Sequence, residues 1–222
     1  ALMTGWDMEP PEPGHADNTK QAGEEIENAA GGEADASEAS LVGTLVHQVY
    51  RLWGPGCEWG RAASYVEREL GVVNPERREE IRGRVHALLE NGRRMTWPDA
   101  VHDGRREVAV LLRFGGLTLR GRIDLVWSEG IDGGIVDYKT NNVTSSDLDE
   151  LVRSHGYDHQ ARLYALALQQ ARRLDRVHAE LAFLDPGERR AWLVDEQVSM
   201  FYREQADLFL TRMAAGVVEA PI

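Results

Sequence analysis

The sequence predicts an α/β fold in which a mixed central sheet is flanked by helices and preceded by a helical N-terminal front. Apolar residues recur with helical spacing from position 40 to position 91, and with strand-like alternation from Arg106 onward. After the alternating segments, helical and alternating patterns follow one another to the end of the chain. A length of 222 residues, 42% of them hydrophobic, suits one globular domain with some additional loose chain.

The helical front comprises three segments. Ser40 is an N-cap candidate, and the apolar stripe that follows it predicts an amphipathic helix through Trp53. Two more helices are expected over residues 61–70 and 75–91, and the second of these should stop at Asn91-Gly92, since glycine favours the end of a helix.

The second part of the chain alternates strands with helices. Gly115-Gly116 and a later Gly-rich stretch separate three alternating segments, which predict a three-stranded meander. A helix, two short strands around an Asp-Pro-Gly turn and a closing helix complete the domain. The expected strands are 106–114, 117–128, 133–140, 177–184 and 190–194, and the expected helices are 157–174 and 196–213.

Acidic residues are concentrated at the N-terminus. Residues 1–40 carry a net charge of −9, whereas residues 41–222 carry −3. Residues 9–40 hold few large apolar side chains that could offset the entropy of ordering. We therefore expect an acidic, disordered linker over 1–39 and a folded domain over 40–222, and the Ala-Leu-Met start indicates a piece of a longer protein.

Composition excludes several protein classes. A single cysteine, Cys57, excludes a disulfide framework, a four-cysteine zinc site and an iron–sulfur cluster built from this chain alone, and is typical of a reducing cytosol. No run approaches the roughly 20 apolar residues of a membrane span, and the first residues are acidic where a signal peptide would be basic. Neither lysine lies in a phosphate-binding loop, so any ATPase must lie elsewhere.

Potential catalytic residues lie on two of the expected strands. Alternation places Asp137 and Lys139 on one face of their strand, with Val136 and Tyr138 on the other. Asp124 lies on the preceding strand and can share a divalent metal ion with Asp137 if the register brings them opposite, because paired buried carboxylates need a counter-charge. The opposite, buried face of that preceding strand is expected to consist of Ile123, Leu125 and Trp127.

Each candidate residue also has an ordinary structural explanation. Asp137 and Lys139 could form a surface salt bridge, His47 could be a solvent-facing histidine, and Gln160 and Tyr164 could pack at the edge of the core. Only their joint order and spacing favours a functional site.

Four sequence blocks together resemble the RecB-like branch of the PD-(D/E)XK nuclease superfamily. The blocks are G-T-L-V-H ending at His47, G-R-I-D ending at Asp124, I-V-D-Y-K-T containing Asp137 and Lys139, and Q-A-R-L-Y ending at Tyr164. The resemblance spans about residues 40–213 and implies a restriction-endonuclease-like core, in agreement with the fold class above.

The resemblance also implies residue roles. It assigns Mg²⁺ or Mn²⁺ binding to four positions, catalysis to the two aspartates and the lysine, and substrate positioning to the last motif. It gives no separate role to Glu107. The implied metal ligands are His47, Asp124, Asp137 and the backbone carbonyl of Tyr138; the implied catalytic residues are Asp124, Asp137 and Lys139; and the implied substrate-positioning residues are Gln160 and Tyr164.

The implied reaction is metal-dependent hydrolysis of a DNA phosphodiester. Oxygen ligands suit Mg²⁺, and one imidazole makes Mn²⁺ a good substitute. The chain has 23 arginines and two lysines, so the lysine at position 139 indicates a need for a compact ammonium. Such nucleases commonly accompany an SF1-type helicase/ATPase module that processes DNA breaks, which implies a bacterial, cytoplasmic, nucleoid-associated protein without membrane contact.

Two alternative functions stay open: a nuclease-like module that binds DNA or supports a helicase without cutting, and a metal-dependent hydrolase of another substrate. The near-neutral body keeps the second open, since a domain that grips duplex DNA alone usually has a basic surface. His155 and His159 have metal-ligand spacing only if both lie within one helix; we expect them at a helix start, in contact with phosphate or solvent.

Overall fold

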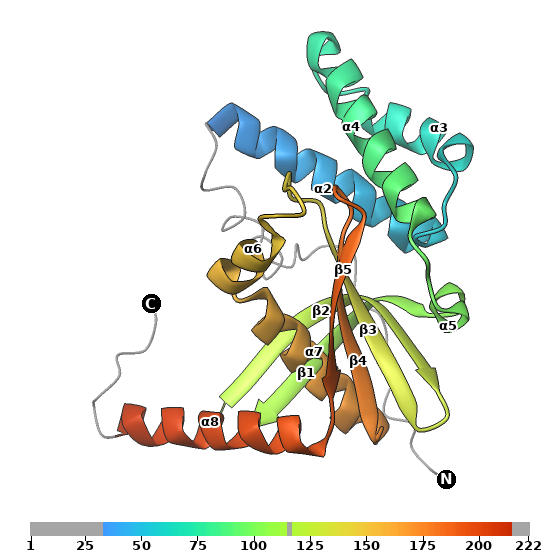
Figure 1. Ribbon diagram of the computed structural model, residues 1–222. Helices are drawn as coiled ribbons and strands as arrows, with labels where there is room; N and C mark the ends of the chain where they lie inside the picture. Colours follow the sequence, from blue (N-terminus) through green and yellow to red (C-terminus); the bar gives the residue numbers. More distant parts are fainter. Residues whose placement is uncertain (1–32, 115–116, 215–222) are drawn as a thin grey trace.

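A five-stranded mixed sheet lies at the centre of the fold, with helices on both of its faces (Figure 1). The computed structural model describes residues 33–114 and 117–214. The strands are β1 (Arg105–Phe114), β2 (Leu117–Glu129), β3 (Asp132–Lys139), β4 (Arg176–Phe183) and β5 (Glu188–Val194). The helices are α2 (Glu33–Trp53), α3 (Trp59–Leu70), α4 (Pro75–Arg94), α5 (Asp99–His102), α6 (Leu148–His155), α7 (Tyr157–Arg172) and α8 (Glu196–Ala214).

The strands follow one another in space as they do in sequence. β1, β2 and β3 form an antiparallel meander, β4 runs parallel to β3, and β5 returns antiparallel to β4. Helices α6 and α7 make the crossover that a parallel β3–β4 pair requires. The predicted mixed sheet and its five strands are confirmed.

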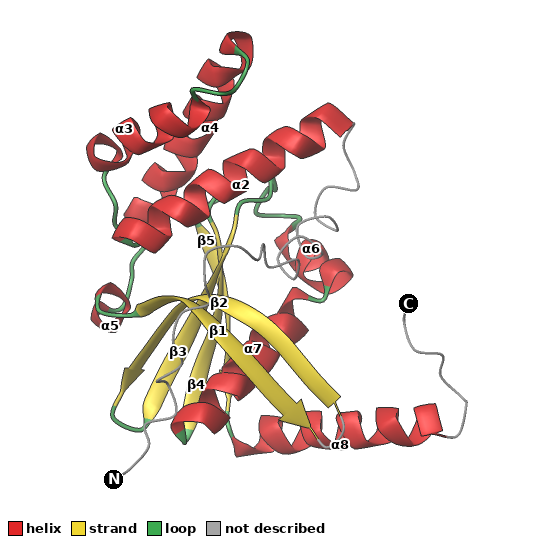
Figure 2. Ribbon diagram, turned by 180° about the vertical axis from the view of Figure 1, so that it is seen from behind, coloured by secondary structure: helices red, strands yellow, loops and turns green. Residues whose placement is uncertain are grey.

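Two hydrophobic cores cover the two faces of the sheet. Val49 and Val85, from the N-terminal helices, pack with Val136 on one face. Ala161 and Ala165 of α7 pack with other strand residues on the opposite face. Figure 2 shows α2, α3 and α4 grouped at one end of the sheet and α7 along its length. Polar side chains on β3 are therefore buried from both sides, which makes their charges costly unless they are paired.

The N-terminal helix is longer than predicted. α2 begins at Glu33, seven residues before the expected N-cap at Ser40, so the helix extends into the predicted linker. Alanine and glutamate dominate residues 33–39 and favour helix once a packed helix follows them. The rest of the predicted linker, residues 1–32, lies outside the described residues.

Two further differences concern helix boundaries. α4 continues through Gly92 to Arg94, so the predicted stop at Asn91-Gly92 is wrong. A Cβ atom at position 92 would lie 1.9 Å from the Tyr50 hydroxyl, so this glycine permits close packing rather than a helix end. The short helices α5 and α6 were not predicted.

Strand β2 does not keep one buried face. Ile123 packs in the core beneath α7, whereas Leu125 and Trp127 pack against the N-terminal helices. The prediction that these three residues share a face is therefore wrong for Ile123. The change occurs next to Glu107, which faces this part of β2 from β1 and adopts a φ of 53°. A left-handed residue interrupts the regular alternation of a strand.

Candidate metal centre and active site

Three carboxylates from three adjacent strands form a row across the sheet. The β1–β2 register pairs Arg106 with Leu125 and Val108 with Ile123, which places Glu107 opposite Asp124. The antiparallel β2–β3 register pairs Leu125 with Val136. Asp124 and Asp137, the next residues on the two strands, therefore lie opposite each other. The antiparallel register thus brings the two predicted aspartates opposite each other, and adds Glu107 to them. We call Glu107, Asp124 and Asp137 the carboxylate row.

Asp124, the middle member of the row, is held by two contacts. Its Oδ2 atom accepts a hydrogen bond from the backbone N–H of Tyr138 at 2.8 Å. Its Oδ1 atom lies 3.2 Å from Nδ1 of His47, which comes from α2. Gly43 lets α2 reach this position, because a Cβ there would lie 3.1 Å from Oγ1 of Thr140, just beyond β3. The small residue one turn before His47 therefore sets the distance between the helix and the row.

His47, Glu107 and Asp124 bring together a donor set for a cation. One ligand atom from each can be chosen so that all three lie within 4.8 Å of one another. Two carboxylates and an imidazole form a donor set that suits Mg²⁺ or Mn²⁺. No role was predicted for Glu107 from the sequence, although it is an acidic residue on the strand before Asp124. The residues present thus fit a divalent metal ion.

The third carboxylate, Asp137, is nearly buried and forms an ion pair. Its Oδ2 atom lies 3.1 Å from Nζ of Lys139, and the two side chains are only 10% and 9% exposed. Burial raises the pKa of Asp137 above its ordinary value, and the charge of Asp124 raises it further, while the Lys139 ammonium lowers it. Crowded carboxylates in a dry site favour a bound cation.

Three different groups surround the ammonium of Lys139. Besides Asp137, Nζ lies 3.8 Å above the ring of Tyr157 and within 3.4 Å of Oε1 of Gln160. A carboxylate, an aromatic face and an amide oxygen all favour a positive charge there. No role was predicted for Tyr157, the first residue of α7, because nothing in the local sequence pattern links it to β3.

Gln160 and Tyr164 lie on the face of α7 that covers the site. Oε1 of Gln160 lies 3.4 Å from Nζ of Lys139. Burial raises the pKa of Tyr164, and the charge of Asp137 raises it further. Gly121 of β2 makes room for the Tyr164 ring, because a Cβ at that position would lie 2.5 Å from Cε1. The structure therefore brings both residues of the last motif to the Asp137–Lys139 pair.

The backbone of Tyr138 is oriented towards the carboxylate row. Its N–H points at Asp124 in the neighbouring strand β2. In an extended strand the N–H and C=O of one residue point to the same side. The Tyr138 carbonyl therefore faces the β2 side as well, as a ligand role would require.

The two remaining histidines of interest do not form a metal site with each other. His155 ends α6 and His159 lies in α7, with Gly156 in the left-handed conformation between them. Nδ1 of His159 lies 2.8 Å from the Tyr202 hydroxyl, and His155 contacts Leu151 O. Their metal-like spacing is broken by the helix boundary.

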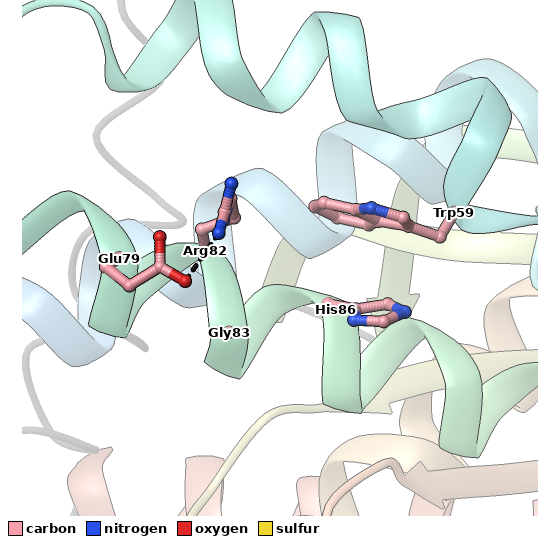
Figure 3. A pocket seen from close by; sticks show the side chains of 5 residues that line it. All are labelled: Trp59, Glu79, Arg82, Gly83 and His86. Atoms are coloured by element: carbon pink, nitrogen blue, oxygen red, sulfur yellow. Dashed lines mark hydrogen bonds and ion pairs between the residues drawn. The ribbon is translucent and has the colours of Figure 1, made fainter.

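A cavity of about 270 Å³ lies between α3 and α4, away from the predicted site residues. Figure 3 shows Trp59 and His86 facing each other, with Arg82 directed at Glu79. The two rings are 4.7 Å apart, and Arg82 pairs with both Glu79 and Glu67. No helix in residues 33–114 or 117–214 has the length and apolar character needed to cross a membrane.

Comparison with known proteins identifies a family. The model of the PD-(D/E)XK nuclease superfamily matches residues 21–220. No curated protein matches the chain. Nine chains from solved structures match. One of them, named "Putative exonuclease" and from Eubacterium rectale, is 18% identical with a TM-score of 0.51, covering 82% of this chain and 69% of its own. At that identity the likeness shows the fold alone.

Proposed function

Since the chain belongs to the PD-(D/E)XK nuclease superfamily, we propose that it is a divalent-metal-dependent deoxyribonuclease that hydrolyses phosphodiester bonds. The observation that carries the proposal is the carboxylate row beside Lys139. Asp124 and Asp137 lie one register step past the Leu125–Val136 pair, and Lys139 forms an ion pair with Asp137. This arrangement places carboxylate ligands for a metal ion next to the Lys139 ammonium.

His47, Asp124, Asp137 and the Tyr138 carbonyl would hold the metal ion, and Glu107 would join them from β1. A bound Mg²⁺ or Mn²⁺ would polarise the phosphoryl oxygen and lower the pKa of the attacking water. The imidazole makes Mn²⁺ an effective substitute for Mg²⁺.

Lys139 supplies positive charge where the negative charge of the transition state develops. Its contacts with Asp137, Tyr157 and Gln160 fix the ammonium before substrate arrives, so little reorganisation is needed during the reaction. The ammonium either orients the attacking water or neutralises the reacting phosphoryl group. We propose that Gln160, which contacts Lys139, and Tyr164 on the same face of α7 position the substrate against this pair.

We place the chain in the RecB-like branch, as the nuclease module of a helicase-nuclease that processes DNA ends in double-strand-break repair. The four ordered motifs support the branch. The net charge of −3 over residues 41–222 supports a partner, because a helicase on the same polypeptide or in a complex would deliver the strand to a domain of low basic charge. With DNA as the proposed substrate, we propose a bacterial, cytoplasmic and nucleoid-associated location.

End-labelled linear DNA and circular DNA, incubated with Mg²⁺, Mn²⁺ or EDTA, test this function. We expect degradation with either metal and none with EDTA. Cleavage that persists in EDTA would contradict metal dependence. Binding without cleavage under every condition would favour the non-cutting module, although the intact Asp124, Asp137 and Lys139 argue against it.

A further inference from the structure

The β1–β2 ribbon continues beyond the carboxylate row with an unusual charge pattern. From Val108 to Phe114 and from Leu117 to Ile123, every charged residue is an arginine: Arg113 on β1, and Arg120 and Arg122 on β2. The folded body as a whole carries more acidic than basic side chains. This half of the ribbon, which extends towards α8 in Figure 1, is therefore a local exception.

Register and burial place the arginines on one face. Val108, Val110 and Leu112 of β1 pack into the core beneath α7. The alternating residues Ala109, Leu111 and Arg113 are exposed. Their cross-strand partners, which share their face, are Arg122, Arg120 and Thr118.

The row of arginines starts at the metal centre. The Arg122 guanidinium lies 3.6 Å from Oε2 of Glu107, and Arg122 is only two residues from Asp124. Arg120 lies two residues from Arg122, about 6.8 Å away along β2. Arg113 lies on β1 opposite Thr118, diagonally beyond Arg120. Guanidinium groups spaced along an extended ribbon suit a chain of phosphates.

We propose that Arg122, Arg120 and Arg113 form a phosphate track, which holds the backbone of the DNA substrate as it leaves the metal centre. The proposal rests on the proposed function and adds the path of the strand. Among the described residues of β1 and β2, this face carries three arginines and no acidic residue beyond Glu107, so we expect its ligand to be a polyanion. Contacts of this kind act on the backbone, so the track binds without sequence preference.

Arg122 links the track to the metal centre. A metal ion bound by Glu107 would draw that carboxylate away from the Arg122 guanidinium and strengthen the attraction of Arg122 for phosphate. Metal and DNA should therefore bind cooperatively, and each should raise the affinity for the other by the same factor.

Fluorescence anisotropy with labelled single-stranded oligonucleotides tests the track. The full chain carries Lys139→Ala to block cleavage. Its affinity for the oligonucleotide is measured in the presence of Mn²⁺ at several salt concentrations. Adding Arg113→Gln, Arg120→Gln and Arg122→Gln should weaken binding on the order of tenfold or more, equally for different sequences. The slope of log affinity against log salt should fall by about 2, since each single-strand phosphate contact contributes about 0.7.

A matched control removes three arginines that pair with acids elsewhere on the surface. Arg68, Arg93 and Arg176 contact Glu69, Glu90 and Asp132. Replacing these three arginines with glutamine changes the net charge by the same amount as the test variant does. The control should keep the parental salt slope. If Arg120→Gln alone is used because the triple variant melts early, the slope should fall by about 0.7.

The outcomes separate the two proposals. In one outcome the triple arginine variant and the control lose the same DNA affinity, while wild type cuts DNA and the Lys139→Ala chain binds it. That result would overturn the phosphate track but not the nuclease function. If the parent binds no DNA and wild type never cuts, both proposals are wrong.

Discussion

Glu107 lies opposite Asp124, between the Arg106–Leu125 and Val108–Ile123 pairs, and adopts a φ of 53°. A left-handed conformation is costly for a residue with a side chain, and such strain concentrates at functional sites. Here it accompanies the change of face that sends Ile123 and Leu125 into different cores. The distortion places a carboxylate of the edge strand β1 beside Asp124 of β2.

If Glu107 contributes to the metal centre, Glu107→Gln should weaken Mn²⁺ binding by about tenfold and lower the cleavage rate by at least as much. Thermal melts with and without Mn²⁺ provide the measurement, because a ligand stabilises only the state it binds. Glu129→Gln, at the far end of β2, removes the same charge and should keep the full Mn²⁺ shift. Equal shifts in both variants would remove Glu107 from the centre.

The pH dependence of stability should reveal the burial of Asp137. Its pKa is raised in the folded state, so folding is most favourable while the carboxyl is protonated, below its ordinary pKa of 3.8. The cost of ionising it in the folded protein grows as pH rises from 3.8 to the raised pKa, and is constant above that.

Asp137→Asn lacks this cost. In EDTA, the melting temperature of the variant minus that of wild type should therefore increase as pH rises through this window and then level off. Mn²⁺ should reverse the order at high pH, because it should stabilise wild type more than the variant that lacks one carboxylate ligand. A difference that does not vary with pH would mean that burial does not shift this group.

Lys139→Arg should behave nearly like Lys139→Ala. A guanidinium would pair bidentately with Asp137 and draw it from the metal, whereas an ammonium acts as a compact point charge. Each variant should lose on the order of a hundredfold in cleavage rate, with DNA affinity little changed. Near-wild-type cleavage by the arginine variant would show that only the charge at this position matters.

Gly121→Ala should disturb the site from beneath α7. A Cβ there would lie 2.5 Å from the Tyr164 ring, so the ring must move, at a cost of about 1–3 kcal/mol in unfolding free energy. Cleavage should fall several-fold as Tyr164 and Gln160 shift. Gly83→Ala is the control: it has open space in helix α4 and should stabilise the protein by about 0.5–1 kcal/mol. Unchanged cleavage in Gly121→Ala would remove Tyr164 from substrate positioning.

Deleting residues 1–32 should preserve or raise the activity of this chain on DNA. The N-terminal segment is strongly acidic and repels phosphate, an effect that weakens as salt is added. The cut lies before Glu33, where α2 begins, so the melting temperature should stay the same. Loss of folded protein after the deletion would assign the segment a structural role.

The local sequence pattern was sufficient to predict the strands and part of the candidate site. Asp137 and Lys139 share one face of β3, and Val136 and Tyr138 pack on the other, because successive side chains of a strand point to opposite sides whatever surrounds them. The turn at Gly115-Gly116 indicated that β1 and β2 pair, and a short connection made β2 and β3 neighbours. The approach of Asp124 to Asp137 was thus expected, with only the register left undecided.

Tertiary structure alone decided which groups complete the site. Glu107 joins Asp124 because the β1–β2 register sets it there, and Tyr157 meets Lys139 because the crossover returns α7 over β3. The glycines at 92 and 121 are explained only by Tyr50 and Tyr164, which lie far away in sequence. A sequence pattern reports the periodicity of one segment, whereas these contacts join separate segments, and only the packing of the sheet against its helices fixes them.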